Sequence, residues 1–166
     1  MNFQHEILDV NNELVVIEVG QYCIIEDGAK IGKGSSIGHY TIIEKDVTIG
    51  DNVKIGSHCE IRKGSRIGDN TRLGSECLVA QDTFIGKDCS IHGAFISTDF
   101  RKLHDKERDF CIIEDRVMTG VGVKMIAGSR IGRSSIVGAN STVFGAVPPR
   151  EIWAGTPAKL IHKHII

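Results

Sequence analysis

Aliphatic side chains return at every sixth position over most of this chain, between Val19 and Val147. A small or β-branched residue stands four positions after nearly all of them, and glycine often follows directly. A period of six fits neither the 3.6-residue period of an amphipathic helix nor the two-residue alternation of a long strand. The pattern therefore predicts short strands in a repeated arrangement. The most regular run consists of Ile25, Ile31, Ile37, Ile43, Ile49, Ile55, Ile61, Ile67, Leu73, Val79, Ile85 and Ile91.

A six-residue repeat is typical of a β-helix in which three hexapeptides complete one triangular coil. Residues eighteen positions apart then stack, and successive coils lie about 4.8 Å apart, as paired strands do. We therefore expect three parallel sheets whose aliphatic columns fill the axis, with function on the outer surface. The columns are Ile25, Ile43, Ile61, Val79 and Ser97; Ile31, Ile49, Ile67 and Ile85; and Ile37, Ile55, Leu73 and Ile91.

The period fails once, after Ser97. Sixteen residues separate Ser97 from Ile113, where six would keep the phase, so about ten residues are inserted within a charged segment at residues 98–110. Insertions in repeat proteins map to loops, often on a binding face, and long loops in compact domains are usually functional. We interpret the insertion as the wall or lid of an active site, with a solvated excursion as the alternative. The period then resumes, and it places Val147 in the last small position.

The length of 166 residues predicts a single domain over 1–166. We expect an N-terminal cap at 1–18, a β-helix at 19–147 that contains the inserted loop 98–110, and a C-terminal cap at 148–166.

The C-terminal cap should begin where Pro148 and Pro149 end the repeat, because proline cannot donate to a strand ladder. Thr156 is a suitable N-cap and Pro157 suits the first helical position, so we expect a short C-terminal helix. Its apolar residues, Leu160, Ile161, Ile165 and Ile166, would cover the last coil.

Composition narrows the range of partners. The net charge of -1 gives no sign of nucleic-acid binding, and no apolar run approaches the roughly 20 residues of a membrane span. The amino terminus shows no leader pattern. All five cysteines fall in the small inward position, which favours free thiols in a reducing compartment, the cytoplasm, over a disulfide scaffold or a thiol nucleophile. These are Cys23, Cys59, Cys77, Cys89 and Cys111.

The hexapeptide run, its single insertion, the coil Ile136–Ser141 and the segment Trp153–Lys159 together resemble the hexapeptide-repeat acyltransferases. The likeness is greatest to small sugar and nucleotide-sugar O- or N-acetyltransferases. It implies an all-β, left-handed parallel β-helix with one corner loop insertion, and a homotrimer with active sites between neighbouring prisms. The handedness comes from the resemblance alone, because crossovers between parallel strands are nearly always right-handed.

The resemblance also implies an activity. An acyl-CoA-dependent O- or N-acyltransferase would move an acetyl or other short acyl group from acetyl-CoA (acyl-CoA) to a hydroxyl or amine. The acceptor would be a sugar or a nucleotide-linked sugar in surface polysaccharide biosynthesis. No metal is expected.

Acyl transfer to a hydroxyl needs a base, and it needs donors for the developing oxyanion. Many members of the family use a histidine in or beside the corner loop, where His104 stands next to Asp105. Asp99, two residues after Ser97, is the second candidate, and His92, which replaces the usual glycine after its repeat aliphatic, is the third. The alternatives are a solvated loop histidine for His104 and a turn aspartate for Asp99. The sequence does not decide which of the three is the base.

Family placement puts the pantetheine arm of coenzyme A along the coils after the insertion. Gly120, Gly138 and Ala139 are the matching positions, where small side chains let a ligand approach the backbone. Lys159 is expected to meet the phosphates.

Two other functions stay open at this stage. A γ-carbonic-anhydrase-like metalloenzyme would share the fold, but zinc catalysis usually needs three protein ligands. Those enzymes carry a histidine pair five residues apart, and this chain has no such pair. The third possibility is a non-catalytic β-helix binding module.

Overall fold

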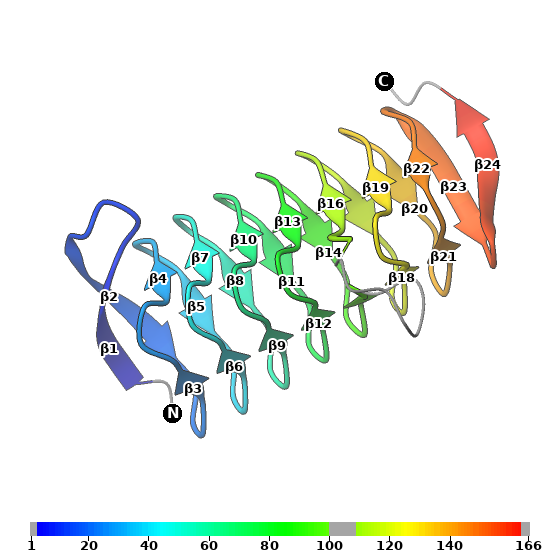
Figure 1. The fold of residues 1–166 in the computed structure, drawn as a ribbon. Coiled ribbons are helices and arrows are strands. Elements are labelled where there is room, and N and C mark those ends of the chain that lie inside the picture. Colours follow the sequence, from blue (N-terminus) through cyan, green and yellow to red (C-terminus); the bar gives the residue numbers. More distant parts are fainter. Residues whose placement is uncertain (1–2, 100–108, 164–166) are drawn as a thin grey trace.

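The structure, a computed structural model, describes residues 3–99 and 109–163 as an all-β solenoid (Figure 1). Three sheets, here named A, B and C, form the three sides of a prism. Sheet A contains, in spatial order, β1 (Phe3–Leu8), β2 (Leu14–Val19), β5 (Ser36–Ile37), β8 (Lys54–Ile55), β11 (Arg72–Leu73), β14 (Ser90–Ile91), β17 (Met118–Thr119), β20 (Ile136–Val137), β23 (Glu151–Gly155) and β24 (Ala158–Lys163).

The other two sheets are entirely parallel. Sheet B contains β3 (Ile24–Ile25), β6 (Ile42–Ile43), β9 (Glu60–Ile61), β12 (Leu78–Val79), β15 (Ile96–Ser97), β18 (Lys124–Met125) and β21 (Thr142–Val143). Sheet C contains β4 (Lys30–Ile31), β7 (Thr48–Ile49), β10 (Arg66–Ile67), β13 (Phe84–Ile85), β16 (Ile112–Ile113), β19 (Arg130–Ile131) and β22 (Ala146–Val147).

The observed register confirms the three predicted columns. Ile25 pairs with Ile43 in sheet B, eighteen residues on. Across the insertion the interval lengthens by ten residues, as in the pairing of Phe84 with Ile112. The predicted ten-residue insertion is therefore confirmed between β15 and β16, at the corner where sheet B turns into sheet C. His104 and the other residues of 100–108 lie outside the described residues.

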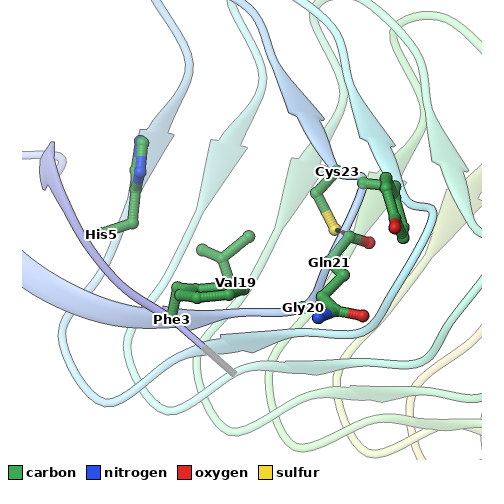
Figure 2. A pocket seen from close by; sticks show the side chains of 7 residues that line it. Phe3, His5, Val19, Gly20, Gln21 and Cys23 are labelled. Atoms are coloured by element: carbon green, nitrogen blue, oxygen red, sulfur yellow. Dashed lines mark hydrogen bonds between the residues drawn. The ribbon is translucent and has the colours of Figure 1, made fainter. Parts of the chain in front are cut away.

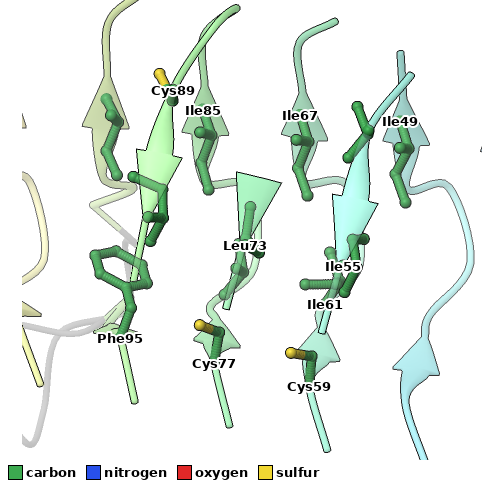
Figure 3. Packing of buried hydrophobic residues seen from close by; sticks show 14 of the residues in the cluster. Ile49, Ile55, Cys59, Ile61, Ile67, Leu73, Cys77, Ile85, Cys89 and Phe95 are labelled. Atoms are coloured by element: carbon green, nitrogen blue, oxygen red, sulfur yellow. The ribbon is translucent and has the colours of Figure 1, made fainter. Parts of the chain in front are cut away.

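The axis of the prism is filled by one continuous apolar cluster (Figure 3). Its one large departure from the repeat is Phe95, which is fully buried in a position that elsewhere holds small side chains such as Cys59 and Cys77. Ser97, in the same coil, occupies an aliphatic column, and its Oγ accepts a hydrogen bond from the Ala80 amide at 2.8 Å. The small serine leaves volume that the phenylalanine ring fills, so packing density is kept.

The last coil differs from the prediction. Val147 pairs with Ile131 and so occupies the aliphatic column, not the small position. The step from Val143 to Val147 spans four residues instead of six, and Gly145 takes a φ of +75° within it. Glycine adopts this left-handed conformation without a steric penalty, which permits the shorter corner.

The predicted C-terminal helix is wrong. Residues Ala158–Lys163 form β24, antiparallel to β23, and β23 continues sheet A beyond the proline pair. Thr156 does not cap a helix, because its hydroxyl donates to the Asn140 carbonyl at 3.1 Å. Trp153 and Ala158 pack against the core, whereas Ile161 is 65% exposed. A strand pair is favoured because it satisfies the backbone groups at the edge of sheet A.

At the other end, β1 and β2 form an antiparallel pair, and β2 joins the parallel part of sheet A through β5. None of the described residues belongs to a helix long and apolar enough to cross a membrane.

Candidate active site

The surface features of the prism lie along its three corners. The A–B corner, where each coil passes from sheet A to sheet B, collects residues from every coil described. The B–C corner carries the insertion, and the C–A corner completes the coil. The A–B corner comprises residues 20–22, 38–40, 56–58, 74–76, 92–94, 120–122 and 138–140, and the turn 154–156 between β23 and β24 stacks on its last coil.

Five of the seven predicted site residues gather at one end of the A–B corner. His92, Gly120 and Gly138 stack in successive coils, and Ala139 follows Gly138. Lys159 reaches the last coil of this corner, because β24 pairs it with Ala154. His92 was predicted as a catalytic residue, and the other four were predicted to bind the coenzyme.

Asp99 lies elsewhere, at the B–C corner. It is half-buried beside Thr98, whose Oγ accepts a hydrogen bond from the Ala127 amide at 2.9 Å. A hydrogen bond to Glu60 is the main reason why the pKa of Arg62 is raised, and the negative charge of Asp99 adds to that effect. Asp99 and His92 thus stand at opposite ends of one side of the prism, and within one chain they do not meet.

The His92 ring is held by the backbone of the next coil. Its Nδ1 lies 2.6 Å from the carbonyl oxygen of Thr119. Because a carbonyl can only accept, Nδ1 donates its proton to that oxygen, so in the neutral form of the ring Nε2 holds the lone pair. This tautomer can accept a proton from a substrate.

His92 also occupies a position that suits glycine. Its own amide is 3.3 Å from the Thr119 oxygen, whereas the equivalent bonds from Gly74 and Gly120 measure 2.8 Å. A side chain at this position therefore lengthens the backbone hydrogen bond to the next coil.

Close stacking of the coils accounts for the glycines themselves. A Cβ added to Gly120 would lie 2.5 Å from the Ala139 amide nitrogen, and one added to Gly138 would lie 2.8 Å from the Ala154 Cβ. Gly38, far from the insertion, meets the same limit at 2.5 Å from backbone. Small side chains here are thus required by packing, and they do not by themselves indicate a ligand.

The A–B corner has two halves, which differ in whether the backbone amide of the middle residue in each turn is hydrogen-bonded. In the first coils its amide donates to a side chain one coil on: Gln21 to Nδ1 of His39 at 2.9 Å, and His39 to Oγ of Ser57 at 3.0 Å. Ser57 donates in the same way to Oγ of Ser75 at 3.2 Å. These amides in the N-terminal half of the corner are therefore already hydrogen-bonded and cannot donate to a ligand.

From Ser75 onward the next coil offers no such side chain. Within residues 3–99 and 109–163, the amides of Ser75, Gly93, Val121 and Ala139 have no acceptor. They form a row of free N–H donors that begins in the coil before His92 and continues past it. Lys124 borders the row, with Nζ 3.4 Å from the Gly122 oxygen. Sequence reasoning missed these donors, because their freedom depends on what stands one coil away.

A second surface feature lies on sheet C, beside the end of the insertion. A hollow of about 620 Å³ is lined by Arg66, Asp82, Phe84, Phe110 and Ile112, among others. Phe84 and Phe110 are 41% and 50% exposed, so the hollow has an aromatic wall.

The thiols and the acidic groups offer no separate chemistry. Cysteines 59, 77, 89 and 111 are buried and unpaired, and burial raises the pKa of the Cys89 and Cys111 thiols. Across the described part of the chain, no three His, Cys, Asp or Glu side chains are grouped so as to hold a metal ion.

Comparison with known sequences identifies the repeat. A profile of the bacterial transferase hexapeptide family (six repeats) matches residues 28–63 and 46–81. The matched repeats lie within residues 28–81, so the family profile describes this part of the β-helix. Among solved structures of such transferases, the polySia specific acetyltransferase NeuO is similar, with a TM-score of 0.55 and 29% identity over 89% of this chain and 83% of that one. The fold is the left-handed β-helix of these acetyltransferases, as expected.

Curated proteins match shorter stretches of this chain. WbbJ of Escherichia coli (strain K12), an O-acetyl transferase assigned to lipopolysaccharide biosynthesis, is 37% identical over 83 residues, 44% of this chain and 41% of that protein. Galactoside O-acetyltransferase of Lactococcus lactis subsp. lactis (strain IL1403) is 35% identical over 68 residues, 41% of this chain and 33% of that protein. The chain spans less than half the length of either relative.

Proposed function

We propose that this protein transfers an acetyl or other short acyl group from acyl-CoA to a hydroxyl or amine of a sugar or nucleotide-linked sugar. The observation that carries the proposal is the His92 ring, fixed by Thr119 beside a row of free backbone amides. The similar proteins support the reaction class, because they include a galactoside O-acetyltransferase and the polySia specific acetyltransferase NeuO.

The chemistry follows from these groups. Nε2 of His92 takes the proton of the acceptor hydroxyl or amine as its oxygen or nitrogen attacks the thioester carbonyl. A free amide, that of Gly93 or Val121, donates to the oxyanion that forms. The intermediate then expels the coenzyme A sulfur, which receives the proton from His92. The acyl ester or amide and free coenzyme A are the products.

The coenzyme would lie along the C-terminal half of the A–B corner. The amides of Val121 and Ala139 could donate to the carbonyl oxygens of the pantetheine arm. Lys124 and Lys159 supply positive charge for the phosphates. Gly120 and Gly138 keep the corner narrow enough for a ligand to reach these amides.

A second copy of the chain would complete the site. His92 and Asp99 stand at different corners, so within one prism these two candidates do not meet. In a homotrimer, the insertion of one prism would reach the A–B corner of the next. Asp99 and His104 would then act on the acceptor from the neighbouring copy. Five free cysteines favour the cytoplasm as the place of action.

Release of coenzyme A thiol, measured with acetyl-CoA and a panel of sugars and nucleotide sugars, tests the activity. We expect acceptor-dependent release that is lost in His92→Ala. If acetyl-CoA produces no thermal shift at millimolar concentration and no acceptor releases thiol, the protein is a binding module and the proposal is wrong.

Mixing two inactive variants tests the shared site. His92→Ala and His104→Ala should each be inactive by themselves. Part of the activity should return when their subunits are exchanged, because some interfaces then hold both intact histidines. Failure to regain activity despite demonstrated subunit exchange would contradict a site built from two copies.

A further inference from the structure

We infer that the N-terminal half of the A–B corner binds an uncharged acceptor glycan of several sugar units, with one unit stacked on Tyr22. The inference rests on the proposed function and extends it to the class of acceptor. Three observations carry it: an aromatic stack, a pocket at the end of that stack, and the distribution of charge among the corners.

Three exposed rings stack along this corner in successive coils. The centroids of Tyr22 and Tyr40 are 4.9 Å apart, and those of Tyr40 and His58 are 5.1 Å apart, with nearly parallel planes. Tyr22 is 72% exposed and Tyr40 is 51% exposed. The stack runs along the axis of the prism, so an added ring can continue it only at an end.

The N-terminal end of the stack opens into a pocket. Tyr22 lines a hollow of about 440 Å³ together with Phe3 and His5 of β1 and with Gln21 and Cys23, among others (Figure 2). That volume lies in the range of small-molecule sites. No aromatic neighbour among the described residues covers the second face of Tyr22.

The lining suits a sugar ring. The C–H face of a pyranose is apolar and packs on an aromatic face, while its hydroxyls need donors and acceptors at the edge. Tyr22 and Phe3 offer aromatic surface, and Gln21 and His5 offer polar groups. The lining contains no lysine or arginine.

Charge is unevenly distributed among the corners. Between Tyr22 and His92 the A–B corner carries aromatic, imidazole, amide and hydroxyl side chains, and Glu76 is its one charged residue. The other two corners over the same coils carry charged residues in every coil, for example Lys45 and Arg62. A nucleoside diphosphate on the A–B corner would meet the negative charge of Glu76 without a cation from the corner itself.

The length of the corner sets the size of the acceptor. Tyr22 and His92 are four coils apart, which is about 19 Å at the spacing of paired strands. A single sugar ring cannot contact both. An oligosaccharide can lie along the corner with one end on Tyr22 and its reacting unit beside His92. The amides of Val121 and Ala139, which would hold coenzyme A, lie beyond His92, where the proposed glycan site ends.

A direct binding measurement separates this inference from catalysis. Saturation-transfer NMR without acyl-CoA would use neutral gluco- and galacto-configured oligosaccharides, N-acetylated forms included, of one to six units. A uridine diphosphate hexose is the comparator, because Lys54 and Arg72 on the adjoining side of sheet A are the basic residues that could favour it. We expect binding to strengthen with length and the nucleotide sugar to bind no better than a monosaccharide.

Variants at Tyr22 give the decisive comparison. Tyr22→Ala should weaken the longest oligosaccharide roughly tenfold, the scale of one ring-stacking contact. Tyr22→Phe should bind like the wild type. Phe144→Ala, which removes an exposed ring away from this corner, is the matched control.

Three results would overturn the inference: equal binding of all lengths, preference for the nucleotide sugar, or unchanged binding in Tyr22→Ala. A change in oligomeric state in Tyr22→Ala, measured by light scattering, would also overturn it and assign the corner to contact between copies. Because no acyl-CoA is present, length-dependent binding with no thiol release in any assay would leave the glycan site standing and reject the transferase.

Discussion

Replacing His92 by glycine should lower kcat far more than it lowers the free energy of unfolding. The substitution restores the residue type that Gly74 and Gly120 place in the same column. It removes the hydrogen bond to the Thr119 oxygen, worth about 0.5–1.5 kcal/mol, and adds a glycine entropy cost of about 0.5–1 kcal/mol. In return, the ladder bond of 3.3 Å can shorten toward the 2.8 Å of its neighbours. We expect a net loss of unfolding free energy below about 2 kcal/mol.

The catalytic effect should be larger. Loss of a general base usually lowers the rate by roughly 10²–10⁴-fold, which corresponds to about 2.7–5.4 kcal/mol in the barrier. For a chain of this size, a loss of 2 kcal/mol lowers Tm by at most about 8 °C. The variant should therefore remain folded at assay temperature while its kcat collapses.

Three measurements check this prediction. Circular dichroism gives Tm, thiol release gives kcat, and added imidazole should restore part of the turnover by entering the space left by the side chain. His162→Ala, which removes an exposed histidine of β24, is the control and should change neither quantity. Retention of kcat within about threefold would place the base elsewhere. Unfolding of the variant would show that the coil-stacking argument is wrong.

Three further variants test the core, the corner and the ion pairs. Phe95→Ala should lower the unfolding free energy by about 3–5 kcal/mol in denaturant titrations, because it empties a fully buried ring site; a loss below 1 kcal/mol would contradict the packing account. Ala139→Leu, at an exposed position, should raise the KM for acetyl-CoA without changing Tm, whereas Lys33→Leu on the C–A corner should change neither; equal KM values would remove coenzyme A from this corner. The hydrogen bond from Arg130 lowers the pKa of Glu114, so this carboxylate stabilises the fold at pH values above its ordinary pKa of about 4.3. Glu114→Gln should therefore cost on the order of 1 kcal/mol at pH 7, and the difference from wild type should vanish as pH falls through the lowered pKa; a gap that persists in acid would point to packing.

The sequence predicted the scaffold well, because the inward and outward positions of a β-helix are set by local spacing. The column that contains Ile25 and Ile43, and the length of the insertion, follow from counting residues. Even His92 could be singled out, since it breaks a glycine column. The aromatic stack was also within reach of the sequence, because Tyr22, Tyr40 and His58 are spaced eighteen residues apart.

The tail could not be predicted in the same way. Thr156 and Pro157 satisfy the local rules for a helix start. However, the backbone groups at the edge of sheet A need hydrogen-bond partners, and β24 provides them. The place of Val147 likewise depends on a shortened corner at Gly145, which the period alone cannot show.

By itself, the sequence determined a prism with three sheets, a filled axis and one interruption, because each of these depends on neighbours within a coil. Only the tertiary structure decided how the corners work. Whether the amides of Val121 and Ala139 are free depends on a side chain one coil away, and the proton on His92 is placed by a carbonyl twenty-seven residues on. The separation of His92 from Asp99 has the same origin, since seven residues along the chain lead from one corner of the prism to the next.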